Sequence, residues 1–280
     1  MVRRGMQKLT EIRALLDARG LSPRKQFGQN FLLDHNLIKK LVDAARVAEG
    51  DVVLEVGPGT GTLTEELLAR GATVVAAEVD RGLCELLRER FASWGDRFTL
   101  VEGDALDGKR AMSEAIRTTV EARRAGRDFK LVSNLPYAAG TPIMSILLAD
   151  HPECAGQYVT IQREVGDRLR AGPGSKDYGP LAVLAQAVAR VEVVAHLPPE
   201  CFWPRPDVHS AMVAIERRTD PATREPRRLF DFAQRIFEKR RKQLGAIIGR
   251  ERVWPTGTGP EMRAEQLSPA RFVDLMATGA

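Results

Sequence analysis

One stretch, from Val52 to Gly61, limits what this chain can fold into more than any other part of the sequence. It reads V-V-L-E-V-G-P-G-T-G, so a run of β-branched and other apolar residues leads into a cluster of glycines. The residues that follow, T-L-T-E-E-L-L, have the apolar period of a helix. This order predicts a buried parallel strand, a tight turn and a helix start, which together form the βα unit of a nucleotide-binding protein.

The glycine spacing and two acids indicate which ligand this turn would hold. Gly57, Gly59 and Gly61 are spaced G-x-G-x-G rather than the G-x-G-x-x-G that seats a pyrophosphate on a helix N-terminus. Glu55 is expected to end the first strand, and Glu78 ends the next apolar run. A carboxylate there can accept both hydroxyls of a ribose and favours a cation. S-adenosylmethionine fits, because it is a nucleoside with a sulfonium and no phosphate; the alternative is an ordinary glycine-rich turn of any doubly wound protein.

Strand and helix patterns then alternate, with a strand at 73–78, a helix at 81–92 and a strand at 98–102. This alternation predicts an α/β fold, a Rossmann-like parallel sheet with right-handed crossovers. Ligands of such sheets lie beyond the carboxyl ends of the strands, where Asp104 could accept a hydrogen bond from an adenine amine. We interpret residues 108–127 as a charged helical insertion on the surface.

The next apolar run, 129–133, ends in Asn134-Leu135-Pro136-Tyr137. The Asn134 amide and the Pro136 carbonyl can accept hydrogen bonds from an amino group, while Tyr137 offers a stacking face. Methyl transfer to an exocyclic amine needs this combination, because acceptors on its hydrogens draw the nitrogen lone pair out of the ring. The alternative is a turn that ends a strand, with a core tyrosine.

Composition excludes several other classes of protein. A chain of 280 residues with 44% hydrophobic content can bury a full core. The sequence has no apolar run long enough to span a membrane and no N-terminal signal pattern, so we expect a cytoplasmic protein. The three cysteines are scattered without C-x-x-C spacing, which predicts neither a disulfide framework nor a metal site. The net charge of +5 is mild, so its distribution matters more than its sum.

Both ends of the chain are basic. Residues 1–28 form a basic arm, in which Ile12, Leu15 and Leu16 could form a short amphipathic turn, or which could be a solubilising tail. The stretch 25–34 could fold over a ligand as a lid or be a helix entry packed by Phe31, and Asp34 is expected to cap the next helix. In the tail, one helical stripe runs from Ala233 to Ile248, with Arg240 inside it and therefore expected to be paired at the interdomain seam.

The order of these motifs resembles the ribosomal RNA adenine dimethyltransferases of the KsgA type. The resemblance covers about residues 24–276 and includes Q-N-F-L, E-V-G-P-G-T-G, G-D-A and N-L-P-Y. It continues through Q-R-E-V at 162–165, G-P-G-S-K-D-Y-G at 172–179 and the F-x-P-x-P-x-V-x-S-A pattern at 202–211. One departure is that Ala138-Ala139-Gly140 follow N-L-P-Y, where relatives usually have Asn or His, then Ile, then Ser or Gly. The missing side chain at position 138 leaves the bracing of that turn open.

The resemblance implies roles for individual residues. The implied cofactor contacts are Asn30, Leu32, Gly57, Gly59, Glu78, Asp104 and Asn134. Asn134 and the Pro136 carbonyl would hold the target amine, while Tyr137 and Phe202 would stack on a flipped adenine. The residues expected to contact RNA phosphates are Arg24, Lys25, Lys239, Arg241 and Lys242.

The expected activity is transfer of methyl groups from S-adenosylmethionine to N6 of two adjacent adenines near the 3′ end of small-subunit (16S) ribosomal RNA. The expected partner is that RNA or a 30S-type pre-ribosomal particle, and the protein is expected to act as a monomer. The expected domains are the arm 1–28, a catalytic domain 29–217 and a small helical RNA-binding domain 218–280.

The alternative functions are those of the antibiotic-resistance dimethyltransferase of large-subunit RNA, a non-catalytic RNA- or DNA-binding factor, and a dinucleotide oxidoreductase. The E-V-G-P-G and N-L-P-Y motifs argue against the first of these, and the intact acids and Asn134 against the second.

Overall fold

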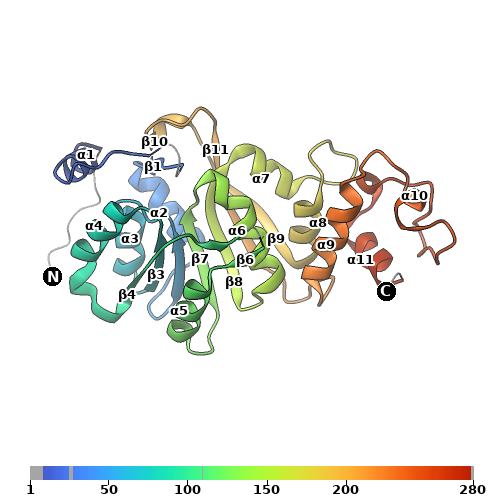
Figure 1. Cartoon of the computed structure of the whole chain (residues 1–280), viewed down its shortest axis with the longest axis horizontal. Coiled ribbons are helices and arrows are strands. Elements are labelled where there is room, and N and C mark those ends of the chain that lie inside the picture. Colours follow the sequence, from blue (N-terminus) through green and yellow to red (C-terminus); the bar gives the residue numbers. More distant parts are fainter. Residues whose placement is uncertain (1–8, 25–27, 109, 279–280) are drawn as a thin grey trace. The chain divides into compact units, whose positions relative to one another are not determined.

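The computed structural model describes residues 9–24, 28–108 and 110–278 (Figure 1). Residue contacts divide the chain into two compact units. Unit 1 consists of Met1–Met144, Glu153–Arg163 and Val193–Ala214, and unit 2 of Ser145–Pro152, Glu164–Glu192 and Ile215–Ala280. Both units are therefore built from separate segments of the sequence. The division into an arm, a catalytic domain and a tail at 28/29 and 217/218 remains a prediction.

A seven-stranded sheet with the order β4-β3-β2-β7-β8-β11-β9 runs through the fold. Its strands are β2 (Val52–Val56), β3 (Thr73–Glu78), β4 (Phe98–Glu102), β7 (Phe129–Asn134), β8 (Cys154–Gln162), β9 (Ala189–Leu197) and β11 (Ser210–Arg217). The five strands from β4 to β8 in this order pair in parallel, as the alternation of strands and helices predicts. Every residue of β2 is buried, because β2 lies between two strands and is covered on both faces.

The helices of unit 1 include those that the sequence predicts after Asp34, after Gly61 and at 81–92. They are α1 (Leu9–Asp17), α2 (His35–Ala44), α3 (Thr62–Ala69), α4 (Arg81–Phe91), α5 (Glu114–Arg124) and the start of α6 (Tyr137–Asp150). Asp34 caps α2, as predicted, by accepting hydrogen bonds from the backbone N–H groups of Asn36 and Leu37. Ile12 and Leu16 of α1 are buried in the core of unit 1, so this part of the basic arm is an amphipathic helix rather than a tail.

Residues 108–127 are not a surface insertion, which corrects the interpretation of their charge. They contain β6 (Ala111–Met112), which pairs with β5 (Leu106–Asp107), and then α5, which contacts β2, β3 and β4. Ile116 and Val120 are the buried residues of α5. α5 is therefore the crossover helix that joins β4 to the parallel strand β7. The many charged residues of this segment led to the prediction of a surface insertion, whereas the two apolar residues form the buried face of the helix.

Unit 2 is mainly helical. Its helices are α7 (Arg163–Arg170, whose first residue is assigned to unit 1), α8 (Pro180–Val188), α9 (Pro226–Phe237), α10 (Gly245–Ile248) and α11 (Pro269–Ala277). α8, α9 and α11 pack on one another, and the ring of Phe237 stacks on that of Phe272 with centroids 5.6 Å apart. In the described residues, no helix is long and apolar enough to span a membrane.

The continuous helical stripe predicted from Ala233 to Ile248 is wrong. α9 ends at Phe237, and the chain then turns through residues 238–244 before the single turn of α10. In this turn the Arg240 guanidinium donates hydrogen bonds to the carbonyls of Ser175, Lys176 and Tyr178, each at 2.9 Å. Arg240 is paired, as predicted, but its partners are backbone carbonyls of the same unit.

Candidate active site

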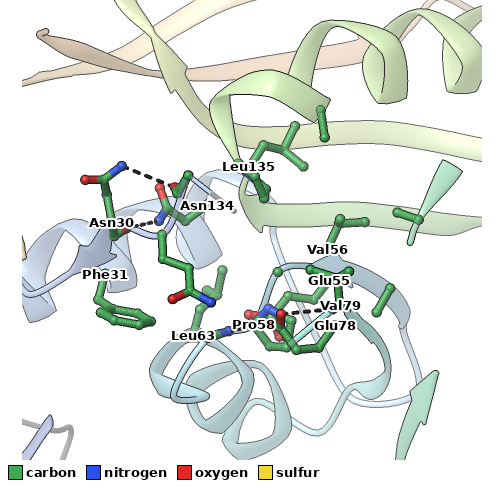
Figure 2. A pocket seen from close by; sticks show the side chains of 18 of the residues that line it. Asn30, Phe31, Glu55, Val56, Pro58, Leu63, Glu78, Val79, Asn134 and Leu135 are labelled. Carbon is green, nitrogen blue, oxygen red and sulfur yellow. Dashed lines mark hydrogen bonds between the residues drawn. The ribbon is translucent and has the colours of Figure 1, made fainter. Parts of the chain in front are cut away.

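A cavity of about 290 Å³ lies in unit 1 at the carboxyl ends of β2, β3 and β7 (Figure 2). Its walls include nine of the ten residues to which the sequence assigns a cofactor-binding or catalytic role. These nine are Asn30, Leu32, Gly57, Gly59, Glu78, Asp104, Asn134, Pro136 and Tyr137. Segments more than a hundred residues apart in the chain therefore meet at the edge of the sheet where a ligand of such folds is expected.

The floor of the cavity is the glycine turn between β2 and α3, and its shape requires glycine. Gly57, Gly59 and Gly61 have φ values of 70°, 60° and 84°. A Cβ added to Gly59 would lie 2.7 Å from the ring of Phe31, and one added to Gly61 would lie 2.5 Å from the ring of Phe91. The G-x-G-x-G spacing thus allows the turn to pass closely under two aromatic side chains.

Glu78 at the end of β3 presents a buried carboxylate, 4% exposed, to the cavity (Figure 2). It accepts backbone hydrogen bonds from Val79 at 2.9 Å, from Asp80 at 3.0 Å and from Gly59 at 3.3 Å. Burial raises the pKa of this carboxyl, although the three backbone N–H groups oppose that rise. Because the Gly59 N–H already faces a carboxylate, the glycine turn is unsuited to an anionic phosphate.

Glu55 is the second acid of the cavity wall and is more deeply buried, with 1% exposed. Its carboxyl accepts a hydrogen bond from Thr64 Oγ1 at 2.7 Å. Burial raises its pKa from 4.5 to about 8, with a smaller contribution from the negative charge of Glu78. The wall therefore offers one acid that holds its proton near neutral pH and a second that three backbone amides help to ionise.

Asn134 at the end of β7 has a defined amide orientation. Its Nδ2 donates to the backbone carbonyl of Asn30 at 2.8 Å, and the Asn30 Nδ2 donates in turn to the carbonyl of Gly28 at 3.2 Å (Figure 2). A carbonyl can only accept, so the amino side of Asn134 must face Asn30, and Oδ1 remains as its acceptor. The segment ahead of α2 thus fixes the acceptor that the chemistry needs.

That segment is also attached to β3 and α4. Gln29 Nε2 donates to Asp80 Oδ2 at 3.3 Å, and Arg24 Nε lies 3.5 Å from the same oxygen. Asp80 is 3% exposed and caps α4. Arg24, predicted to contact RNA, therefore has an acidic partner within the chain, while its side chain remains half exposed. Lys25 lies outside the described residues.

The N-L-P-Y turn differs from expectation at Pro136. Its carbonyl accepts the N–H groups of Ala139 and Gly140, both at 3.0 Å, because α6 starts here. The Pro136 carbonyl therefore takes no part in strand pairing, but it already accepts two hydrogen bonds within α6. For this reason Asn134 Oδ1 becomes the main acceptor for an amine. These bonds also brace the turn without a polar side chain at Ala138. The hydroxyl of Tyr137 is hydrogen-bonded to Ser210 Oγ at 2.8 Å.

Phe202 is the one predicted catalytic residue that the structure does not bring to the cavity. It is 3% exposed and belongs to β10 (Phe202–Trp203), which pairs antiparallel with β1 (Phe31–Leu32). This pairing places Leu32 opposite Phe202, and both side chains join the core of unit 1. The ring cannot be a stacking face in this conformation.

Three of the residues predicted to contact RNA lie in unit 2. Lys239, Arg241 and Lys242 are all exposed and belong to the turn after α9 rather than to one helix face. Sequence reasoning assigned no role to Ser210, Asp80 or Gln29. For Asp80 a signal existed, because an aspartate after a strand and before a helical pattern is typical of an N-cap.

A largely parallel sheet whose cavity sets a buried carboxylate against the glycine turn, where a phosphate-binding protein offers free amide hydrogens, suits a nucleoside cofactor without phosphate. This combination is typical of the class of S-adenosylmethionine-dependent methyltransferases. The sequence model of the ribosomal RNA adenine dimethylase family matches residues 20–278. The chain therefore belongs to the ribosomal RNA adenine dimethylase family. The fold, the enzyme class and the S-adenosylmethionine cofactor predicted from the sequence are confirmed.

Individual relatives agree with this assignment. A ribosomal RNA small subunit methyltransferase A from Phenylobacterium zucineum (strain HLK1) is 41% identical over 278 residues, which cover 96% of this chain and 93% of that protein. The protein of the same name from Moorella thermoacetica (strain ATCC 39073 / JCM 9320) is 39% identical and covers 95% of both chains. A dimethyladenosine transferase from Plasmodium falciparum shares the fold, with a TM-score of 0.69 at 22% identity over 88% of this chain and 95% of that chain.

Proposed function

We propose that this protein transfers methyl groups from S-adenosylmethionine to N6 of two adjacent adenines near the 3′ end of small-subunit ribosomal RNA. The observation that carries this proposal is the fixed orientation of Asn134, whose Oδ1 is left as an acceptor on the cavity wall. The names of the two bacterial relatives support the choice of the small subunit.

The wall of the cavity suits a cationic nucleoside. Glu78 supplies a carboxylate for ribose hydroxyls, and the glycine turn lets a ligand approach the backbone. Leu32, Ile38 and Leu63 give apolar surface for a flat base, and Asp104 is exposed at the rim of the cavity. When bound, the cofactor supplies an electrophilic methyl group.

The protein's own residues prepare the acceptor. Asn134 Oδ1 accepts a hydrogen from the adenine N6 amine, which draws the nitrogen lone pair out of conjugation with the ring and towards the methyl group. The Tyr137 ring holds the base from one side. After nitrogen gains the methyl it is positively charged and acidic, so its proton can pass to water, and no strong base is required of the site.

The RNA itself would be held outside the cavity. Lys239, Arg241 and Lys242 are exposed cations that can neutralise phosphates, and Arg24 adds charge next to the segment that fixes Asn134. We assign these residues, with the arm and the tail, to RNA binding. We further infer that the protein works as a monomer in the cytoplasm, where its substrate is found.

The test is labelled methyl transfer to small-subunit particles that lack the modification, followed by mapping of the labelled nucleosides. The expected result is N6,N6-dimethyladenine at two neighbouring positions near the 3′ end. Labelling of large-subunit RNA instead would favour the antibiotic-resistance activity. Absence of transfer together with absence of cofactor binding would favour a non-catalytic RNA-binding factor.

A further inference from the structure

The hydroxyl of Tyr137 is tied to the sheet at a point away from its own helix. Tyr137 begins α6 and lines the cavity, and its hydroxyl lies 2.8 Å from Ser210 Oγ. Ser210 is the first residue of β11 and is 0% exposed. One hydrogen bond therefore joins the tip of a cavity-wall side chain to a buried strand that is 73 residues away in the sequence.

The Ser210 end of this bond is firmly held. β11 lies between β8 and β9 in the sheet, and the carbonyl of the preceding residue, His209, accepts a hydrogen bond from the Arg163 N–H at 2.9 Å. The Tyr137 end has more freedom, because its half-buried ring rotates about two side-chain bonds. The bond consequently restrains the tyrosine more than the serine.

The chemistry of a phenol makes this restraint directional. Conjugation keeps the phenolic O–H in the plane of the ring. A hydrogen-bond partner at a fixed position, here Ser210 Oγ, therefore favours one direction of the Tyr137 side chain and one orientation of its ring plane. Burial also raises the pKa of Tyr137 above its ordinary value of 10.0, so the hydroxyl keeps its proton under working conditions and serves as a hydrogen-bonding group rather than a base.

We propose that Ser210 is a positioning residue that holds the Tyr137 ring as the wall on which the target base stacks. This inference rests on the proposed function, since it assigns Ser210 a part in adenine binding. It also gives a role to the last polar residue of the F-x-P-x-P-x-V-x-S-A stretch, whose first residue, Phe202, lies in the core.

The experiment compares three variants: Ser210→Ala, Tyr137→Phe and the double variant. Methyl transfer to small-subunit particles is measured as kcat/KM for the RNA substrate, per cofactor-binding site counted by titration with S-adenosylhomocysteine. This normalisation removes any loss of folded protein. Each single variant loses one neutral hydrogen bond but keeps an aromatic ring, so kcat/KM should fall roughly threefold to tenfold while cofactor affinity stays the same. The double variant should be no worse than either single variant, because all three remove the same bond.

Tyr178→Phe is the matched control, because the Tyr178 hydroxyl makes a bond of the same 2.8 Å length to the Leu267 carbonyl inside unit 2. It should lower the unfolding temperature and leave the normalised kcat/KM unchanged. Unchanged kcat/KM in Ser210→Ala, or losses that multiply in the double variant, would overturn the inference while the wild-type enzyme remained active. If the wild type itself transfers no methyl groups, the proposed function fails instead.

Discussion

Glu55 should make the stability of the protein fall as pH rises, and replacing it with glutamine should remove that effect. An acid whose pKa is higher in the folded state binds its proton more tightly there than in the unfolded chain. Above the unfolded value of 4.5, unfolding releases that proton, so rising pH favours the unfolded chain until the pH passes about 8. The destabilisation is absent below 4.5 and complete above about 8.

The size of the effect follows from the two pKa values. Between about pH 5 and pH 8 the Glu55 carboxyl stays largely protonated in the folded protein and is ionised in the unfolded chain. In this range the free energy of unfolding falls by about 1.4 kcal/mol for each pH unit, so the total loss is about 4 kcal/mol. Glutamine is neutral at every pH and can still accept the hydrogen bond from Thr64 Oγ1. Burying the amino group of the glutamine can lower stability, but this cost does not depend on pH. It shifts the whole curve of unfolding free energy against pH and leaves the slope of that curve unchanged.

The assay is denaturant unfolding of wild type and Glu55→Gln across this pH range, with Glu85→Gln as a control because Glu85 is exposed on α4. The difference in unfolding free energy between Glu55→Gln and wild type should grow by about 4 kcal/mol from pH 5 to pH 8. The control should run parallel to wild type. Parallel curves for Glu55→Gln as well would refute the claim that burial holds a proton on Glu55.

Three further predictions concern the cofactor, the chemistry and the RNA. Asn134→Ala should lower kcat by about 100- to 1000-fold, as for other lost transition-state hydrogen bonds, and change cofactor affinity less; unaltered turnover would remove Asn134 from its role. Glu78→Ala should weaken cofactor binding by about 10- to 100-fold in calorimetry. The variant should bind an analogue without ribose hydroxyls as well as the wild type does. An equal loss of affinity for that analogue would mean that the Glu78 carboxylate does not bind the ribose. Charge reversal at both Lys239 and Lys242 should lower RNA affinity and reduce the slope of log affinity against log salt by about one for each lost phosphate contact. An unaltered slope would mean that this turn does not touch RNA.

The strongest sequence predictions were those in which neighbouring residues determine the local structure. The βα unit at Val52–Gly61 needs only an apolar run and glycines, and its backbone takes the left-handed values that glycine allows. The cap at Asp34 and the strand that ends in Asn134 are local in the same way. For these segments, tertiary packing agrees with what the sequence prefers by itself.

The errors arose where distant residues decide the outcome. The helix predicted to continue past Phe237 ends there, and in the turn that follows Arg240 binds carbonyls far back in the chain, an arrangement that no helical period can indicate. The Phe202 ring lies in the core because β10 pairs with β1. These two strands are far apart in the sequence, so their register cannot be predicted from the residues around Phe202. The bond between Tyr137 and Ser210 likewise depends on the order of strands in the sheet, so the sequence offered no signal for it.

The central claim is that Asn134 holds the target amine beside a cofactor bound in the unit 1 cavity. The most direct measurement is a structure of the protein with S-adenosylhomocysteine and adenosine. The account predicts the cofactor against Glu78 and the glycine turn, with the adenine N6 within hydrogen-bond distance of Asn134 Oδ1 and the base against the Tyr137 ring. An adenine bound away from Asn134, or a cofactor outside this cavity, would contradict it.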